Sequence, residues 1–302
     1  MKIAIYGQFY HQNSGKYIVE LLGIWKKNEV AIYIEEDFLA LLKENYPLIT
    51  KKNFRFDTFK TLDASFSLFI SIGGDGTILK TLSLVKDLGT PIIGINTGRL
   101  GFLATMGKEA IEQHIEEFLK GNYTLSSRTV LEISTTCENQ DFDKFGYALN
   151  EITVSRQNTT SMITVHTQLN QEFLTSYWAD GLIVSTPTGS TGYSLSCGGP
   201  IVLPQTSSLI LTPIAPHNLN MRPLVIPDDK HIELQISGRE EEHLVSLDSR
   251  TYTVSNNSKL YIRKAGFKMN LVQIPTNSFL VTLRDKILWG ADQRNNTNSS
   301  FL

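Results

Sequence analysis

The first 120 residues alternate short apolar runs with stretches whose apolar residues recur at helical spacing. The apolar runs, each closed by glycine or polar residues, cover residues 2–6, 30–34, 67–72 and 91–95. Between them, residues 17–25, 38–42 and 77–85 have the spacing of amphipathic helices. Strands that alternate with helices predict a parallel sheet covered by helices on both faces.

After residue 120 the pattern changes to short segments rich in Thr, Ser, Val and Ile that alternate as half-buried strands do. We expect strands at residues 130–134, 147–155, 163–169, 182–185, 210–214, 231–237, 244–247, 259–263 and 269–274. Residues 278–288 return to helical spacing. We therefore predict a Rossmann-like α/β N-terminal domain over residues 1–120 and an all-β domain over 121–275. A C-terminal helix at 276–290 is expected to pack back on the first domain.

The composition narrows the class of protein without identifying it. Lys and Arg number 28 against 30 Asp and Glu, so charge gives no argument for a nucleic-acid partner or an anionic membrane. The two cysteines, Cys137 and Cys197, are far apart, which argues against a disulfide framework and for a reducing compartment. We find no long apolar span and no secretory leader pattern, and expect a cytoplasmic protein.

A glycine-rich turn interrupts the chain between an apolar run and a helix, at Gly73-Gly74-Asp75-Gly76. Three glycines in four residues allow positive φ and the close approach of a ligand to the backbone. The N–H groups of the following helix favour phosphate, so we expect Gly73, Gly74, Gly76 and Thr77 to bind it. The turn matches neither the dinucleotide fingerprint nor the P-loop.

Asp75 is the unusual residue of this turn. Phosphates repel a carboxylate unless it holds a metal ion or takes a proton from an attacking hydroxyl, and either role fits phosphoryl transfer. The alternative is a plain strand-to-helix turn with Asp75 as a helix cap.

A second glycine-rich segment covers residues 180–200, where an apolar run leads into a loop of Thr, Ser and Gly. Such a loop offers many hydroxyl and backbone donors with little side-chain bulk, which suits phosphates or sugar hydroxyls. Tyr193 could stack on a base. The alternative is a structural Ser/Gly loop.

Several motifs occur together in one order along the chain. They are Gly73-Gly74-Asp75-Gly76-Thr77, the segment 96–103 from Asn96 to Leu103, Asn150-Glu151, the segment 180–200, Ala215-Pro216-His217 and Arg222-Pro223-Leu224. In this combination the chain closely resembles the NAD kinases, from the first strand to about residue 285. The resemblance implies an α/β domain followed by an all-β domain. It also implies phosphorylation of NAD by ATP to give NADP, a divalent metal such as Mg²⁺, and a homodimer or homotetramer.

The resemblance further implies a role for each matching residue. Asp75 would accept the proton of the adenosine ribose 2′-hydroxyl, and Gly76 beside it would contact NAD. Asn150 and Glu151 would contact ribose hydroxyls or phosphates, and Phe102 would lie by the adenine. Asp180 would lie near the nicotinamide end or the neighbouring subunit's ligand. The loop that embraces the nucleotide would contain Thr191, Gly192, Tyr193, Ser194, Leu195 and Ser196.

Three positions depart from the family's usual pattern. Trp178 stands where many members have Arg, and Gly192 replaces a commoner Ala. Arg250 replaces a commoner Gln, could bring its charge towards a phosphate, and is included among the expected NAD-binding residues. His217 reads as a structural histidine.

Two other functions stay open at this point. A lipid or small-alcohol kinase could carry the same glycine turn, and a dinucleotide-binding regulator could have lost catalysis. No Cys/His cluster suggests a dedicated protein-held metal.

Overall fold

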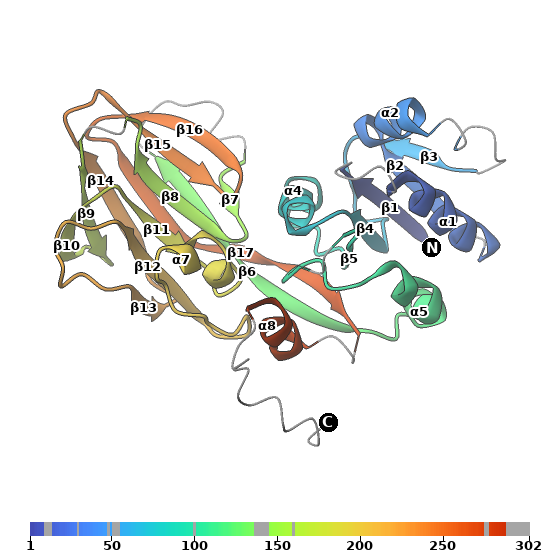
Figure 1. Ribbon diagram of the computed structural model, residues 1–302. Coiled ribbons are helices and arrows are strands. Elements are labelled where there is room, and N and C mark those ends of the chain that lie inside the picture. Colours follow the sequence, from blue (N-terminus) through green and yellow to red (C-terminus); the bar gives the residue numbers. More distant parts are fainter. Residues whose placement is uncertain are drawn as a thin grey trace, which may run out of the picture. The chain divides into compact units, whose positions relative to one another are not determined.

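The structure is a computed structural model (Figure 1) that describes residues 1–8, 14–28, 30–46, 49, 55–98, 101–135, 145–158, 161–274 and 278–287. Contacts divide it into two compact units. The first contains the described parts of residues 1–78, 90–126 and 271–302, and the second contains residues 79–89 and the described parts of 127–270. Arg99, Leu100, Cys137 and the polar tail lie outside the described residues.

The first unit is built on a parallel sheet. Its strands are β1 (Lys2–Gly7), β2 (Ala31–Glu35), β3 (Asp57–Phe59), β4 (Leu68–Ile72) and β5 (Ile92–Ile95). Their order is β5-β4-β1-β2-β3. The end of β17 (Lys259–Gln273) adds to this sheet, with Leu271 paired in parallel to Ile92. The carboxyl ends of β4 and β5 therefore lie side by side, which is where ligands bind in open α/β sheets.

Three helices pack their apolar faces against this sheet: α1 (Ser14–Lys27), α2 (Glu36–Asn45) and α5 (Lys108–Lys120). Two further helices are α4 (Asp75–Val85), which begins in this unit, and α8 (Phe279–Ile287), which has no buried residue. Trp25 of α1, Phe38 of α2 and Phe118 of α5 are at most 1% exposed and share one core with Ile70 of β4. Glu35 caps α2 by accepting a hydrogen bond of 2.7 Å from the Phe38 amide.

The second unit consists almost entirely of strands. They are β6 (Thr124–Thr135), β7 (Tyr147–Ala148), β8 (Glu151–Arg156), β9 (Ile163–Leu169), β10 (Glu172–Ala179), β11 (Gly181–Ser185), β12 (Ser208–Ile214), β13 (Leu224–Pro227), β14 (Ile232–Ser237), β15 (Glu242–Leu247), β16 (Arg250–Ser255) and most of β17. One sheet has the order β13-β12-β11-β8-β15-β16, and β10-β9-β14-β17 form another antiparallel run. Two short helical segments, η1 (Gly189–Thr191) and α7 (Tyr193–Ser196), follow β11.

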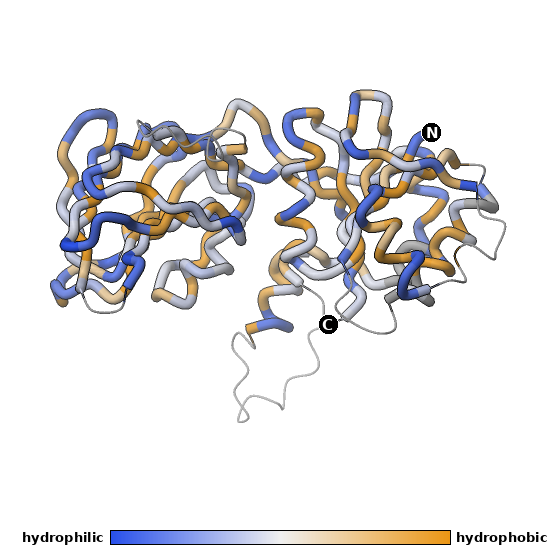
Figure 2. Tube along the Cα trace, turned by 90° about the horizontal axis from the view of Figure 1, so that it is seen from above, coloured by the Kyte–Doolittle hydropathy of each residue, from blue (hydrophilic) through white to orange (hydrophobic). Residues whose placement is uncertain are grey.

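A single apolar core joins the two strand layers of this unit. Ile152 and Val184 from one layer share a cluster with Val165, Leu234 and Leu260 from the other, and all five are fully buried. Figure 2 shows hydrophobic stretches (orange) alternating with hydrophilic ones (blue) along the trace. The unit is therefore a two-layer β structure, as the alternating pattern predicts.

The predicted fold class is confirmed: an α/β unit with a parallel sheet is combined with a β-rich one. The predicted domain bounds stay predictions. Among the described residues, no helix is both long and apolar enough to span a membrane.

Several element predictions were wrong in detail. The expected strand at 147–155 is divided into β7 and β8, and the two expected strands after residue 258 are one, β17. Among the described residues, seven elements were not predicted: β3, α5, β10, η1, α7, β13 and β16. For β10 the reason is its turn, since Asn170 and Gln171 adopt positive φ without the glycine that signals such a hairpin.

Candidate active site

The glycine turn joins β4 to α4 at the carboxyl edge of the parallel sheet. Gly73 donates a hydrogen bond of 2.9 Å to the Ile95 carbonyl at the end of β5. Its φ is 151°, and a Cβ there would lie 2.2 Å from Thr77 Oγ1, so this position requires glycine. Thr77 is fully buried and its Oγ1 has no hydrogen-bond partner. A buried hydroxyl without a partner beside a helix N-terminus suits a phosphate ligand.

Asp75 binds three consecutive backbone amides of a separate segment. Its Oδ2 accepts from the Phe102 amide at 2.8 Å, and Oδ1 accepts from Leu103 at 3.0 Å and Ala104 at 2.9 Å. The side chain does more than cap α4, because it organises the loop that follows β5. A carboxylate has about four acceptor positions, so one remains on Oδ2 after these three bonds.

Gly101 makes this arrangement possible. A Cβ at residue 101 would lie 1.8 Å from Asp75 Oδ1 and 2.4 Å from its Cγ. The loop is also held by Asn96, whose Oδ1 accepts from the Gly98 amide at 2.7 Å. The Phe102 ring contacts the Phe279 ring at 6.0 Å between centroids. The structure therefore brings Asp75 and Phe102 together with the glycine turn.

A second cluster of predicted residues forms in the β-rich unit, around Asn150 and Glu151. These two residues lie between β7 and the start of β8, and Asn150 Oδ1 and Glu151 Oε2 are buried without hydrogen-bond partners. Burial raises the pKa of Glu151 to about 8, the negative charge of Asp248 adds to the rise, and the Tyr193 amide opposes it. Glu151 is thus predominantly a neutral acid at neutral pH.

The loop from 186 to 197 packs against this pair. Thr186 Oγ1 donates to the Leu149 carbonyl at 2.6 Å, and a Cβ on Gly189 would lie 2.1 Å from the Asn150 carbonyl oxygen. Burial raises the pKa of Tyr193, and the charges of Cys197, Asp180 and Glu151 contribute. The sequence-predicted loop residues are therefore neighbours of Asn150 and Glu151.

Residues inside this loop differ in exposure. Ser194 is fully buried and its hydroxyl bonds to Thr212 at 2.8 Å, which gives it a structural contact. Tyr193 is 46% exposed and is free to meet a ligand with its ring. Thr191 donates from Oγ1 to the Thr188 carbonyl at 3.2 Å.

Asp180 connects β10 to β11 and forms an ion pair of 2.9 Å with Arg156. Its amide donates to the Ile214 carbonyl at 3.0 Å. Its side chain is partly exposed, so it remains available to a ligand while its charge is balanced.

Comparison with known families decides which family the chain belongs to. The profile of the ATP-NAD kinase N-terminal domain matches residues 11–123, and that of the ATP-NAD kinase C-terminal domain matches residues 149–274. The chain belongs to the ATP-NAD kinase family.

Relatives and solved structures of this family agree. An NAD kinase of Christiangramia forsetii is 56% identical over 98% of this chain and 100% of its own length, and one of Cytophaga hutchinsonii is 45% identical over the same shares. An Archaeoglobus fulgidus NAD kinase in complex with ATP has a TM-score of 0.73, with 25% identity over 95% of this chain and 99% of its own. The fold also matches yeast NADH kinase complexed with NADH, with a TM-score of 0.82, 24% identity, and coverage of 100% and 89%. None of these comparisons supports a lipid kinase or a silent regulator.

The three departures from the usual ATP-NAD kinase pattern have structural counterparts. The Trp178 ring lies 4.2 Å from the His217 ring and is 51% exposed, and the His217 amide donates to the Trp178 carbonyl. Arg250 donates to the Phe145 carbonyl at 2.8 Å and to the Tyr147 carbonyl. A Cβ on Gly192 would lie 3.0 Å from Glu151 Oε2, so alanine there would crowd the acid.

Two residues of this site in the ATP-NAD kinase fold were not predicted from sequence. Gly101 lies within the segment 96–103, where no role was predicted for it, and none was predicted for Asp248. The signal for Gly101 was its place in a glycine-containing segment after a buried strand. For Asp248 no local signal exists, because its partners lie 97 to 99 residues earlier in the chain.

A metal ion that arrives bound to the triphosphate of ATP would find few protein ligands in the part of the chain that the structure describes. Among the described residues, no group of three or more His, Cys, Asp or Glu side chains could hold a metal. Mg²⁺ in nucleotide sites is commonly held by phosphates and water with one or two carboxylates. The donor set therefore fits an ion that is bound mainly by a triphosphate, with Asp75 as the nearby carboxylate on the glycine turn.

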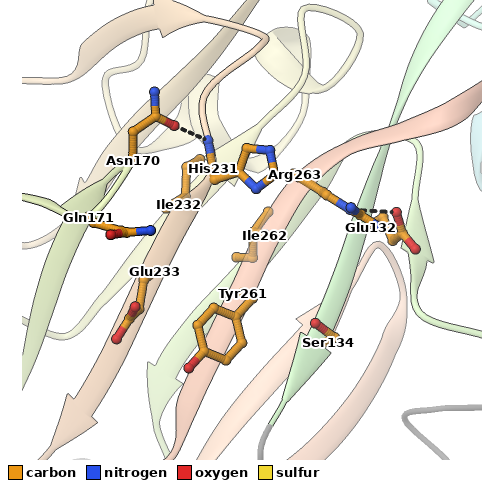
Figure 3. A pocket seen from close by; sticks show the side chains of 10 residues that line it. All are labelled: Glu132, Ser134, Asn170, Gln171, His231, Ile232, Glu233, Tyr261, Ile262 and Arg263. Carbon is orange, nitrogen blue, oxygen red and sulfur yellow. Dashed lines mark hydrogen bonds and ion pairs between the residues drawn. The ribbon is translucent and has the colours of Figure 1, made fainter.

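A pocket of about 650 Å³ lies elsewhere in the β-rich unit, on β6, β14 and β17 and the β9–β10 turn (Figure 3). Two hydrogen bonds join residues that line it. Arg263 bonds to Glu132 at 2.9 Å, and Asn170 Oδ1 accepts from the His231 amide at 2.9 Å. None of the predicted site residues lines it.

Proposed function

We propose that the protein transfers the γ-phosphoryl group of ATP to the 2′-hydroxyl of the adenosine ribose of NAD, giving NADP and ADP. The observation that carries this proposal is the Asp75 carboxylate, held by three amides beside a glycine turn with one acceptor position left. Membership in the ATP-NAD kinase family supports it.

In the proposed step, Asp75 Oδ2 accepts the proton of the 2′-hydroxyl. The ribose oxygen forms a bond to the γ-phosphorus, and the bond between that phosphorus and the β–γ bridging oxygen breaks, so ADP leaves with the electron pair. In this turn Gly74 and Gly76 would offer backbone N–H groups to the phosphates, and Thr77 would offer its hydroxyl. The Gly73 and Thr77 amides already donate to the Ile95 and Gly74 carbonyls, so these two residues would shape the phosphate site without using their own N–H groups. A bound Mg²⁺ would supply charge neutralisation on the triphosphate.

We propose that the second cluster binds NAD. Asn150 Oδ1 and Glu151 Oε2 are buried polar atoms without partners. Vicinal ribose hydroxyls can donate to the amide oxygen and can donate to or accept from the carboxyl group. Phe102 would lie by the adenine, and Tyr193 and its loop neighbours would cover the nucleotide. Asp180 would contact the nicotinamide end.

The test is an assay of NADP formation by the purified protein with ATP, Mg²⁺ and NAD. We expect NADP to form with a 1:1 ratio to ADP. A panel with NADH, polyphosphate and diacylglycerol as alternative donors or acceptors separates the proposed reaction from related kinases. Absence of NADP with every phosphate donor would reject the proposal.

We also propose a homodimer or homotetramer and a cytoplasmic location. Support for assembly comes from exposed apolar residues at the edge strand β13 and the loop before it, where Leu219 is 86% and Val225 is 47% exposed. Light scattering at micromolar concentration tests the assembly, and a monomer there would contradict it.

A further inference from the structure

Asp248 lies outside the predicted site residues, yet it binds the backbone of two of them. It occupies the turn between β15 and β16 with a φ of 52°. Its carboxylate accepts from the Leu149 amide at 2.9 Å, the Asn150 amide at 2.8 Å and the Glu151 amide at 3.2 Å. Its own amide donates to the Glu151 carbonyl at 3.0 Å.

These three contacts require a side chain that accepts hydrogen bonds, and they favour the negatively charged form of Asp248. All three backbone partners are N–H donors, which suit an ionised carboxylate because it only accepts. Burial raises the pKa of Asp248, and the three amides and the nearby Arg250 guanidinium counteract that rise. Of the two carboxyl groups of Asp248 and Glu151, we therefore assign the negative charge to Asp248 and the proton to Glu151.

The contacts also determine where the neighbouring side chains point. Residues 149–151 are held at every amide by one side chain, at the entrance to β8. Asn150 Oδ1 and Glu151 Oε2, which project from this fixed backbone, are buried and have no partner. Two unpaired polar atoms that are fixed relative to each other, one of an amide and one of a carboxyl group, form a template for a ligand with two adjacent hydroxyls, each of which can donate or accept.

We infer that Asp248 is a positioning residue that holds Asn150 and Glu151 in the geometry needed to bind the vicinal hydroxyls of a ribose. This inference rests on the proposed function, since it deepens the role of the NAD-binding cluster. Asp248 acts through the backbone of its neighbours and does not itself touch the substrate.

The charge of Asp248 gives the inference a readout that a purely structural role would not move. The ionisable groups that interact with Glu151 are Asp248 from the β15–β16 turn and Tyr193 and Cys197 from the loop after β11. Arg250 faces Asp248 from β16. Removing the Asp248 charge therefore removes one cause of the raised Glu151 pKa, and the Glu151 titration moves to lower pH.

The test compares Asp248→Asn and Asp248→Glu with the wild type and with Glu241→Gln. Asn keeps the size but turns its amide donors towards at least one backbone N–H, whereas Glu keeps the charge and displaces the three bonds. Glu241 is an exposed acid just before β15, at the end of the strand remote from Asp248, and serves as the matched control.

For Asp248→Asn we expect the KM for NAD to rise about ten- to a hundredfold, the loss expected when a buried polar contact is broken, with the KM for ATP nearly unchanged. The Glu151 titration, followed by carboxyl ¹³C NMR with Glu151→Gln for assignment, shifts downward. Asp248→Glu should raise the KM for NAD as well but leave the titration close to that of the wild type. Glu241→Gln should match the wild type in both measurements.

The inference is overturned if Asp248→Asn has the same KM for NAD and the same Glu151 titration as the control Glu241→Gln. It is also overturned if the KM values for NAD and ATP rise equally. If circular dichroism shows that Asp248→Asn is unfolded at the assay temperature, the test uses Asp248→Glu instead. A rise in its KM for NAD without an equal rise in its KM for ATP supports the inference, and equal rises overturn it. Failure of the wild type to form NADP would reject the proposed function instead, and the titration would still test the link between Asp248 and Glu151.

Discussion

The Phe102 amide donates a hydrogen bond of 2.8 Å to Asp75 Oδ2, the same oxygen that keeps one acceptor position for a substrate. The proposed proton acceptor and the residue expected beside the adenine are therefore connected directly. A change at Asp75 alters the chemistry and, through the loop, the place of Phe102.

Replacing Asp75 by Asn should reveal both effects. The variant removes the proton acceptor, which by analogy with other positioned acid–base groups costs about 10²- to 10⁴-fold in kcat. A loose transition state would place the loss near the lower end. Because the Asn amide group would face the Phe102 N–H, we also expect a several-fold rise in the KM for NAD. Steady-state kinetics measure both, and Asp87→Asn, an exposed acid just after α4, is the control. Full turnover in Asp75→Asn would exclude the residue as the base.

Gly101→Ala should lower kcat through Asp75. The added methyl would lie 1.8 Å from Oδ1, so the carboxylate must rotate away from its three amides. We expect a loss of at least tenfold in kcat, and little further loss when the same change is made in Asp75→Asn. The double-mutant cycle reports this coupling.

The control for Gly101→Ala is Gly23→Ala in α1, where nothing lies within 4 Å of the new Cβ. There alanine should stabilise the helix by about 0.5–1 kcal/mol without changing kcat. If the effects of Gly101→Ala and Asp75→Asn on kcat simply multiply, the two residues act independently and the assigned role of Gly101 is wrong.

Glu151 should make stability depend on pH. Burial and the Asp248 charge raise its pKa from 4.5 to about 8, so between these values the folded protein holds a proton that the unfolded chain has released. Stability must then fall as the pH rises through this window. Relative to Glu151→Gln, the wild type should lose roughly 2–5 kcal/mol of unfolding free energy between pH 4.5 and 8.5. Urea unfolding of both proteins at several pH values measures this, and parallel curves would contradict the raised pKa.

Gly189→Ala should weaken NAD binding. The new methyl would lie 2.1 Å from the Asn150 carbonyl oxygen and 2.5 Å from its carbon, and backbone atoms cannot move aside as a flexible side chain can. We expect the dissociation constant for NAD, measured by calorimetry, to rise about tenfold or more. A tenfold rise corresponds to a loss of about 1.4 kcal/mol of binding free energy. Gly266→Ala in β17 has open space at its Cβ and should bind NAD as the wild type does. Equal affinity in the two variants would show that this loop does not position Asn150.

Much of the fold followed from local patterns. The buried runs at β1, β4 and β5 have no polar interruption, so their strand character was evident, and the glycines after β4 indicated the turn to α4. The pattern failed where local signals are weak. The hairpin that leads into β10 lacks glycine, and the edge strand β13 is short and largely exposed. The edge strand β16 alternates, but only Val254 of its six residues is buried.

The candidate site shows the same division. Asp75 and the Asn150-Glu151 pair were identifiable because their motifs are contiguous in the chain. The partners of these residues were not, because Asp75 meets amides 27 to 29 residues away and Asp248 meets amides 97 to 99 residues away.

By itself, the sequence determined the class of fold, the position of the glycine turn and the candidate residues for the chemistry, since each depends on periodicity or on contiguous glycines and acids. Only the tertiary structure decided that Gly101 must lack a side chain, that Asp248 holds three amides and that Glu151 keeps its proton. These properties depend on distances between segments remote in the chain and on removal of charged groups from water, which no local pattern specifies.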